Sequence, residues 1–133
     1  MTQHIFTYGS LMFAPVWERV VRRHYRSAAA EAHDHVRFCV AGETYPGMIA
    51  QPGARVAGRL YFDVSDDDIA ALDAFEGIDY RRDTITVVAE DGAAQRAATY
   101  VFIAPHRLSA SSWAPDAFEL QRFLATYCRD RLG

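Results

Sequence analysis

Lysine is missing from this chain of 133 residues, and cysteine is rare. All 14 basic residues are arginines. Arginine carries the same positive charge as lysine, so the absence of lysine excludes no class of function. The two cysteines, Cys39 and Cys128, are far apart and form no CxxC motif, which excludes the usual short redox and zinc motifs. We expect both thiols to lie in the hydrophobic core.

A metal site is not indicated either. The five histidines are scattered, and only His33 and His35 lie close together in the sequence. In a strand their side chains would share one face, but no third ligand follows at a suitable spacing. The sequence therefore predicts a loop around Asp34 and no metal.

The chain also lacks a basic leader and a long apolar run. It opens directly into Ile5-Phe6-Thr7-Tyr8. The sequence therefore predicts neither a signal peptide nor a membrane span. We expect a cytoplasmic enzyme or binding domain without a membrane partner.

An excess of positive charge is the next missing feature. The formal net charge is −3 and the pI is about 5.9. Arg19, Arg22, Arg23 and Arg26 are close together, but no aromatic residues alternate with them as in a nucleic-acid site. We interpret them as a solvated face and expect no nucleic-acid partner.

What the chain does contain is enough apolar material for a core, since 50% of its residues are hydrophobic. We expect one domain over residues 1–133, because a chain of this length buries a core without a metal or disulfide. Hydrophobic periodicity predicts a helix opened by Pro15, another up to Glu76 and a third from Pro115. The predicted strands are 4–8, 35–41, 44–51, 55–64, 83–90 and 96–104. This pattern favours an α+β fold with a small, mixed, barrel-like sheet of five to six strands and a few short helices.

The helix that ends at Glu76 has an unusual last residue. Ser65 and Gly77 are typical start and stop residues for it. At about 100° per residue, Ile69 and Leu72 define an apolar stripe, and Glu76 falls on this stripe. The carboxyl group is therefore predicted to face the core.

An inward carboxyl at this position has consequences for its pKa. The terminal carbonyl groups of a helix have partial negative charge, and burial removes water, so both effects disfavour the ionised form. A raised pKa suits a general base or acid. The alternative is a frayed last turn, in which Glu76 leans outward and pairs with Arg81 or Arg82.

Four segments share a pattern with a known family. They are Tyr8-Gly9-Ser10-Leu11, Tyr45-Pro46-Gly47, Val56 to Tyr61, and Leu72 to Arg82. In this order and spacing they resemble the gamma-glutamylcyclotransferase-like family over nearly the whole chain. The chain is most similar to the short plant and bacterial branch, close to gamma-glutamylamine cyclotransferases, whose members end in a helix preceded by a tryptophan, as Trp113 is here.

The resemblance implies a barrel-like fold with a substrate cavity at one end, no cofactor, and a catalytic glutamate that matches Glu76. Such enzymes cyclise the gamma-glutamyl group of a small-molecule substrate and release 5-oxoproline and a free amine. The substrate's own α-amine is the nucleophile, so the enzyme needs no serine or cysteine for attack. It must orient the amine, and Glu76 would move the proton.

The resemblance also points to a substrate-binding turn. The backbone N–H groups of Tyr8, Gly9, Ser10 and Leu11 would hold the substrate carboxylate or the developing oxyanion, and Gly9 would permit a close approach. The alternative is an ordinary turn between a strand and a helix. Tyr80 would line the cavity and hydrogen-bond the substrate, or else belong to the core.

Further expectations concern the residues around the cavity. We expect the segment 105–114 to lie beside the cavity and to select the leaving amine. Pro46-Gly47 would border the pocket or form only an ordinary turn, and Arg82 would pair with a surface acid such as Asp83. A binding domain without catalytic activity and an amide hydrolase that uses water are the two rival functions. The sequence contains no signal for the oligomeric state.

Overall fold

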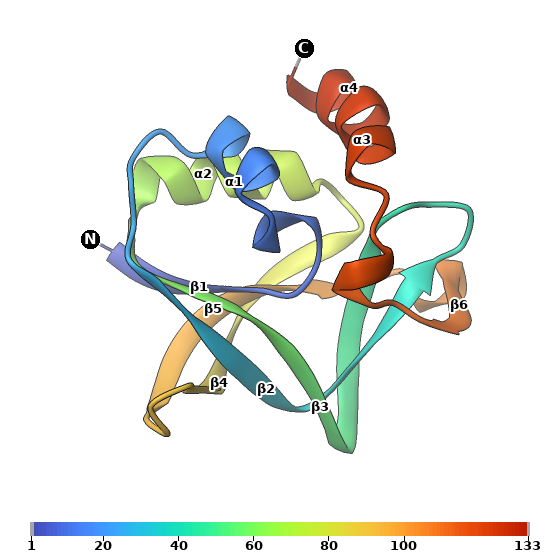
Figure 1. The fold of residues 1–133 in the computed structure, drawn as a ribbon. Helices are drawn as coiled ribbons and strands as arrows, with labels where there is room; N and C mark the ends of the chain where they lie inside the picture. Colours follow the sequence, from blue (N-terminus) through green and yellow to red (C-terminus); the bar gives the residue numbers. More distant parts are fainter. Residues whose placement is uncertain (1, 133) are drawn as a thin grey trace.

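A computed structural model describes residues 2–132 of the chain (Figure 1). The strands are β1 (Thr2–Thr7), β2 (Ser27–Val40), β3 (Pro46–Ser65), β4 (Tyr80–Ala89), β5 (Ala94–Phe102) and β6 (Leu108–Ser112). The helices are α1 (Ala14–Val20), α2 (Asp66–Glu76), α3 (Leu120–Phe123) and α4 (Arg129–Leu132). Short helical turns are η1 (Ser10–Met12), η2 (Pro105–Arg107), η3 (Pro115–Ala117) and the π-helical turn η4 (Leu124–Cys128).

The six strands form one mixed sheet that closes on itself. Their order is β3-β1-β5-β4-β2-β6, and β2 also pairs with β3. This extra pairing joins the two ends of the five-strand order, so β1 to β5 form a ring and β6 extends from β2. Closure pairs the strand edges that would otherwise be exposed. The prediction of an α+β fold with a barrel-like sheet is confirmed.

The β2–β3 hairpin is longer than the sequence predicts. Strands were expected at 35–41, 44–51 and 55–64, whereas β2 begins at Ser27 and β3 is continuous. At Asp34, where a loop was predicted, φ is 61°, and Gly53 on β3 has φ 84°. The Gly53 N–H donates to Asp34 Oδ1 at 2.9 Å, and the register of the two strands shifts between His33 and His35. The residues that resemble a turn therefore form a bulge within paired strands.

This bulge corrects the prediction for the two histidines. His33 and His35 lie on β2, where a loop was predicted. The early part of β2 was missed because alanine is a weak strand former, although Ala30 and Ala32 are buried in alternation. Within residues 2–132, no group of three His, Cys, Asp or Glu side chains is arranged to hold a metal ion.

The C-terminal part also differs from the prediction. Residues 105–114 contain η2 and β6, where only a loop was expected. The helix predicted from Pro115 is interrupted: after η3, the backbone of Glu119 has ψ 76°, and regular helix starts at Leu120. The chain therefore changes direction between η3 and α3 (Figure 1).

The core has two layers on opposite faces of the sheet. Inside the ring lie Phe6, Met48, Leu60 and Val87, all almost fully buried. The outer face of β1, β3 and β5 is covered by the helices, and their shared layer contains Ile5, Trp17, Tyr61, Leu72, Phe123 and Cys128. Neighbours such as Ile5 and Phe6 belong to different layers because side chains alternate along a strand.

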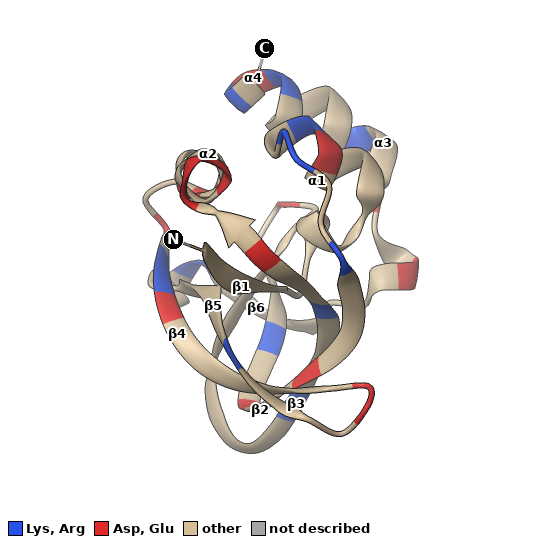
Figure 2. Ribbon diagram, turned by 90° about the vertical axis from the view of Figure 1, so that its left-hand side faces the viewer, with Lys and Arg blue, Asp and Glu red and all other residues tan. Residues whose placement is uncertain are grey.

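Surface features agree with most of the sequence analysis. Acidic and basic residues are mixed over the outer faces, and Arg19, Arg22, Arg23 and Arg26 are exposed (Figure 2). Cys128 is buried, but Cys39 is only half-buried and its thiol donates to the Ser112 carbonyl at 3.6 Å, so its assignment to the core was wrong. In the described part of the chain, no helix is long and apolar enough to cross a membrane.

Candidate active site

The cavity opens where the ends of several elements meet beside the ring. Its empty volume is about 410 Å³, including open space at the mouth. β1 and the turn after it, the start of β3, the end of α2, and the C-terminal segment all contribute side chains. The lining residues are Phe6, Thr7, Tyr8, Gly9, Ser10, Leu11, Tyr45, Pro46, Phe75, Glu76, Tyr80, Tyr100, Phe123 and Tyr127.

Helix α2 delivers Glu76 to this cavity. The Ser65 hydroxyl caps the helix by accepting a hydrogen bond from the Asp68 N–H at 3.4 Å. The other end stops at Gly77, whose φ is 81° and whose N–H donates to the Asp73 carbonyl. Helix and boundaries agree with the sequence prediction, and Glu76 lies half-buried on the cavity wall.

The environment of Glu76 favours its neutral form. Burial raises the pKa of the carboxyl group from its ordinary value of 4.5 to about 8, with Arg131 opposing and Asp73 reinforcing the shift. The alternative outward pairing is not observed. Arg82 pairs with a surface acid, as expected, but this acid is Asp73, at 2.8 Å; Asp83 binds Arg81 at 2.9 Å.

The turn after β1 is held from behind. The Arg37 guanidinium donates to the Tyr8 carbonyl at 2.6 Å and to the Ala57 carbonyl at 3.0 Å. A β-carbon on Gly9 would lie 2.8 Å from two ring carbons of Pro46. The close approach that glycine permits is therefore to β3, and it brings the turn and Pro46 to the same wall of the cavity.

Tyrosine hydroxyls form much of the polar surface of the cavity, and most of them donate a hydrogen bond to another group of the protein. The Tyr8 hydroxyl donates to the Tyr100 carbonyl at 2.5 Å, and the Tyr80 hydroxyl donates to the Pro46 carbonyl at 2.8 Å. Burial raises the pKa of both hydroxyls well above the ordinary value, and the Glu76 charge adds to this. They are thus neutral, and Tyr80 presents only oxygen lone pairs to a ligand.

The aromatic part of the cavity wall was not predicted from the sequence. Tyr45, Phe75, Tyr100, Phe123 and Tyr127 line it, whereas no residue of the segment 105–114 does so within the described chain. The segment lies behind the wall: Leu108 packs on the same small core cluster as the lining residues Tyr45 and Tyr80. Phe123 and Tyr127 are spaced by four residues on a helix, a signal that predicts a buried face without distinguishing a core from a cavity.

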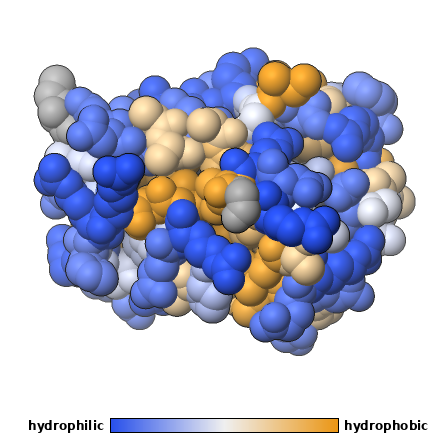
Figure 3. All heavy atoms as spheres, turned by 90° about the horizontal axis from the view of Figure 1, so that it is seen from above, coloured by the Kyte–Doolittle hydropathy of each residue, from blue (hydrophilic) through white to orange (hydrophobic). Residues whose placement is uncertain are grey.

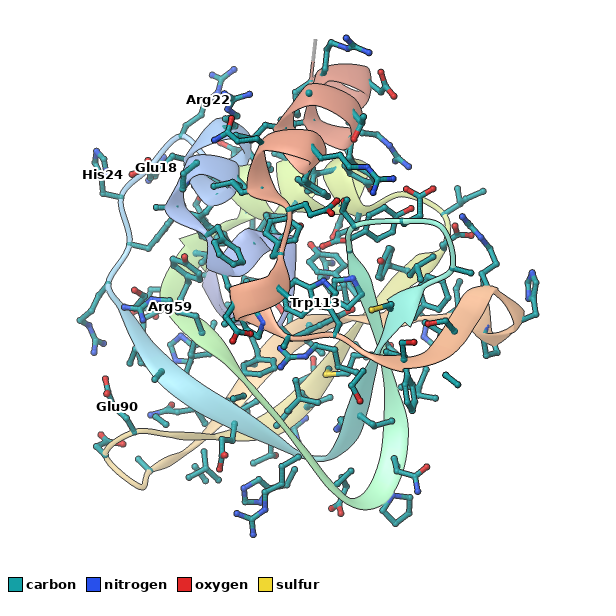
Figure 4. The ribbon with its side chains drawn as sticks, turned by 45° about the vertical axis from the view of Figure 1, so that its right-hand side comes forward. Glu18, Arg22, His24, Arg59, Glu90 and Trp113 are labelled. Carbon is teal, nitrogen blue, oxygen red and sulfur yellow. The ribbon has the colours of Figure 1, made fainter. Side chains whose placement is uncertain are left out.

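Trp113 explains how the C-terminal segment reaches the cavity. Its indole N–H donates to the Thr44 carbonyl at 3.0 Å, and its ring packs on Phe118 at 5.6 Å. In Figure 4, Trp113 lies under the C-terminal segment, while Arg22 and His24 project outward near α1. The segment is thereby anchored before it turns toward α2.

Comparison with known proteins identifies the family. Residues 5–116 match the family described as "Gamma-glutamyl cyclotransferase, AIG2-like". The chain belongs to this family. It is 32% identical over 104 residues to AIG2-like protein D of Arabidopsis thaliana, and the matched region covers 77% of this chain and 68% of the relative. It is 29% identical over 103 residues to Protein AIG2 C of the same plant, with 77% of this chain and 62% of the relative covered.

Several solved structures have the same fold. An Arabidopsis thaliana protein solved in solution has a TM-score of 0.74 at 24% identity, covering 98% of this chain and 82% of that one. A structure named gamma-glutamyl cyclotransferase has a TM-score of 0.60 at 17% identity, covering 98% and 80%. An AIG2-like protein of Mus musculus has a TM-score of 0.64 at 24% identity, covering 88% and 93%. At these identities the likeness shows a shared fold.

Proposed function

We propose that this member of the family is a cyclotransferase that releases 5-oxoproline and a free amine from a gamma-glutamyl amine or amino acid. The observation that supports this most directly is Glu76, a carboxyl group with a pKa near 8 on the wall of a cavity that also contains the Tyr8 to Leu11 turn. A proton carrier near neutrality beside a set of backbone donors is what this cyclisation requires.

The proposed reaction needs one carboxyl group and good orientation. The α-amine nitrogen of the substrate attacks the γ-carbonyl carbon, and a five-membered ring closes. The ionised Glu76 accepts the proton that the amine loses and returns it to the leaving nitrogen as the amide C–N bond breaks. Because attack is intramolecular, holding the substrate in the reactive conformation supplies much of the rate enhancement.

The turn after β1 would bind the negative charge. Residues Tyr8 to Leu11 line the cavity, Ser10 is buried there, and the backbone N–H groups of the turn would donate to the ligand. Preorganised donors of this kind stabilise an oxyanion without reorganisation during the reaction. Arg37 supports the arrangement from behind, since it fixes the carbonyl of Tyr8 on the far side of the turn.

The aromatic wall suits the amine that leaves. Tyr45 packs edge-on against Phe123 and Tyr127, with ring centroids 6.2 and 5.1 Å apart. Their rings offer an apolar surface to the carbon chain of the amine. We propose this wall, in place of the segment 105–114, as the part of the cavity that selects the leaving group.

Two other functions use the same cavity. A binding domain would hold a small amide or carboxylate metabolite without turnover, and a hydrolase would use Glu76 to activate water. Against the first, an acid that has lost most of its hydration is costly unless it has a task. The second would require space for a water molecule beside the scissile amide.

Product analysis distinguishes the three functions. The protein is incubated with a panel of gamma-glutamyl amines and amino acids, and the products are separated by chromatography and mass. We expect 5-oxoproline with a stoichiometric free amine from at least one panel member. Free glutamate would identify a hydrolase, and saturable binding without either product would identify a binding domain.

A further inference from the structure

The C-terminal helical segment, residues 120–132, lies beyond the part of the chain that matches the family, yet it reaches the cavity. Phe123 and Tyr127 from this segment line the cavity together with the turn after β1. Their contacts continue to the last turn of α2, where Glu76 is placed.

Tyr127 binds the end of α2 directly. Its hydroxyl lies 2.6 Å from the Phe75 carbonyl and 3.1 Å from the Glu76 carbonyl. The last carbonyl groups of a helix have no partner within the helix, so an outside donor satisfies them. The Tyr127 ring is itself fixed, stacked on Phe123 with centroids 5.0 Å apart and an interplanar angle of 12°.

Arg131 lies one helical turn further along, next to the same end of α2. Its guanidinium is 4.5 Å from the centre of the Tyr127 ring. A β-carbon on Gly77 would lie 2.5 Å from its Nη1 atom, so the guanidinium packs against the residue that follows Glu76. Among the charges that act on Glu76, Arg131 favours the ionised carboxylate and Asp73 disfavours it.

The other groups that face Glu76 come from the elements packed around it. They are neutral tyrosines, each with a pKa raised by burial and by the Glu76 charge: Tyr8, Tyr80, Tyr100 and Tyr127. A neutral aromatic shell leaves the carboxylate poorly solvated, which increases the effect of one nearby cation.

We propose that Tyr127 and Arg131 are positioning residues for Glu76: the Tyr127 hydroxyl fixes the last turn of α2, and the Arg131 guanidinium favours the ionised carboxylate that accepts the substrate proton. The inference rests on the proposed function, and it makes the C-terminal segment a part of the active site.

Tyr127→Phe tests the first half of the proposal. The ring and its stacking remain, while the hydroxyl is lost. We expect kcat to fall by about tenfold, the rate equivalent of one hydrogen bond, with a smaller change in KM. An unchanged kcat would overturn this role.

Tyr25→Phe is the matched control, because it acts at the opposite end of the same helix. The Tyr25 hydroxyl donates to Asp68 Oδ2 at 2.6 Å and lies 3.0 Å from the Ser65 hydroxyl. Its loss should lower the thermal unfolding midpoint while kcat stays near that of the parent. An equal loss of kcat in both variants would mean that α2 responds to any loss of support, and would overturn a specific role for Tyr127.

Arg131→Gln tests the second half through the pH profile of kcat/KM. Without the cation, the midpoint of the acid limb should move to higher pH, while the rate on the alkaline plateau stays close to that of the parent. Arg129→Gln is the control, since Arg129 is exposed on the same helix and lies 3.8 Å from Asp130. Coincident profiles for the parent and Arg131→Gln would overturn the proposal.

A measurement without substrate separates this inference from the proposed function. Carbon-13 NMR of glutamate-labelled protein gives the titration midpoint of Glu76, assigned with Glu76→Gln. The midpoint should rise in Arg131→Gln, and amide hydrogen exchange at Gly77 should be faster in Tyr127→Phe. If the parent forms no 5-oxoproline, the proposed function fails, and these two results still decide the structural inference: unchanged values overturn it.

Discussion

Asp68 and Glu76 are acidic residues of one helix, yet their surroundings shift their pKa values in opposite directions. Burial opposes ionisation of Asp68, but hydrogen bonds from Tyr25 and from the N–H groups of Arg22 and Arg23 outweigh it and lower its pKa. Glu76 lacks such donors among its named partners, so burial dominates and raises its pKa. The positive N-terminus of α2 favours the first charge, and the negative C-terminus disfavours the second.

The role of Glu76 leads to a prediction about catalysis. Glu76→Gln preserves the shape of the side chain but cannot accept a proton. The variant should fold, and its cyclisation rate should fall by roughly 10² to 10⁴, the usual contribution of a proton-transfer group. Steady-state 5-oxoproline formation measures this loss. Turnover at the parental rate would show that another group moves the proton.

The raised pKa also predicts how stability depends on pH. Because the folded protein prefers the neutral carboxyl, its stabilisation is complete below pH 4.5, the ordinary pKa, and is lost as pH rises through about 8. Glu76→Gln removes this dependence. The unfolding free energy of the parent, relative to the variant, should therefore decrease between pH 5 and pH 9 in urea titrations, and a constant difference would contradict the shifted pKa.

At the scale of elements, the turn after β1 is defined by the groups behind it. Arg37 binds the Tyr8 carbonyl, and Pro46 fills the space where a side chain on Gly9 would project. The shape of the turn thus depends on β2 and β3 as well as on its own residues. Helix α2 is similar, because tyrosines distant in sequence satisfy groups at each of its ends.

This arrangement predicts different effects for two neighbouring substitutions. Gly9→Val should reduce kcat/KM by about 10²-fold or more, because the new side chain collides with Pro46 and displaces the backbone donors. Ser10→Ala retains the backbone and should have a much smaller effect. Kinetics of both variants, with thermal unfolding midpoints, make the comparison. A folded Gly9→Val protein with parental kcat/KM would place substrate binding elsewhere.

At the scale of the molecule, ring closure brings the site together. Strand β1 pairs with β3 on one side and with β5 on the other, so the turn, Pro46 and Tyr100 meet at one end. The helices cover the outer face of these strands, and Figure 3 shows that hydrophilic residues surround the apolar ones on this face. The cavity is therefore a property of the closed ring and the elements that cover it.

Gly58 is the position where closure leaves the least room. A β-carbon there would lie 2.1 Å from the Thr7 carbonyl oxygen and 2.7 Å from the Phe6 ring. Gly58→Val should therefore separate β1 from β3 and lower the unfolding free energy by at least about 3 kcal/mol, the range of severe overpacking. Ala57→Val is the control: Ala57 is exposed on the same strand, and valine suits strands. Denaturant unfolding of both proteins gives the comparison, and equal stabilities would contradict close packing at Gly58.

Local pattern alone was sufficient for several features. Residues one turn apart on a helix are neighbours whatever the rest of the chain does, so the apolar stripe of Ile69 and Leu72 places Glu76 inward, and Ser65 and Gly77 mark the ends of the helix. The motifs at the turn and around Glu76 were likewise sufficient to indicate the family, which the match over residues 5–116 confirms.

Other features depended on contacts between distant residues. The Tyr127 hydroxyl and the Phe75 carbonyl are 52 positions apart, and the Tyr8 hydroxyl and the Tyr100 carbonyl are 92 apart. No local periodicity encodes such pairs, because their proximity arises only when the ring closes and the C-terminal segment packs on α2. The sequence by itself determined which carboxyl group turns inward, whereas the tertiary structure decided what surrounds it, and burial by those surroundings raises its pKa.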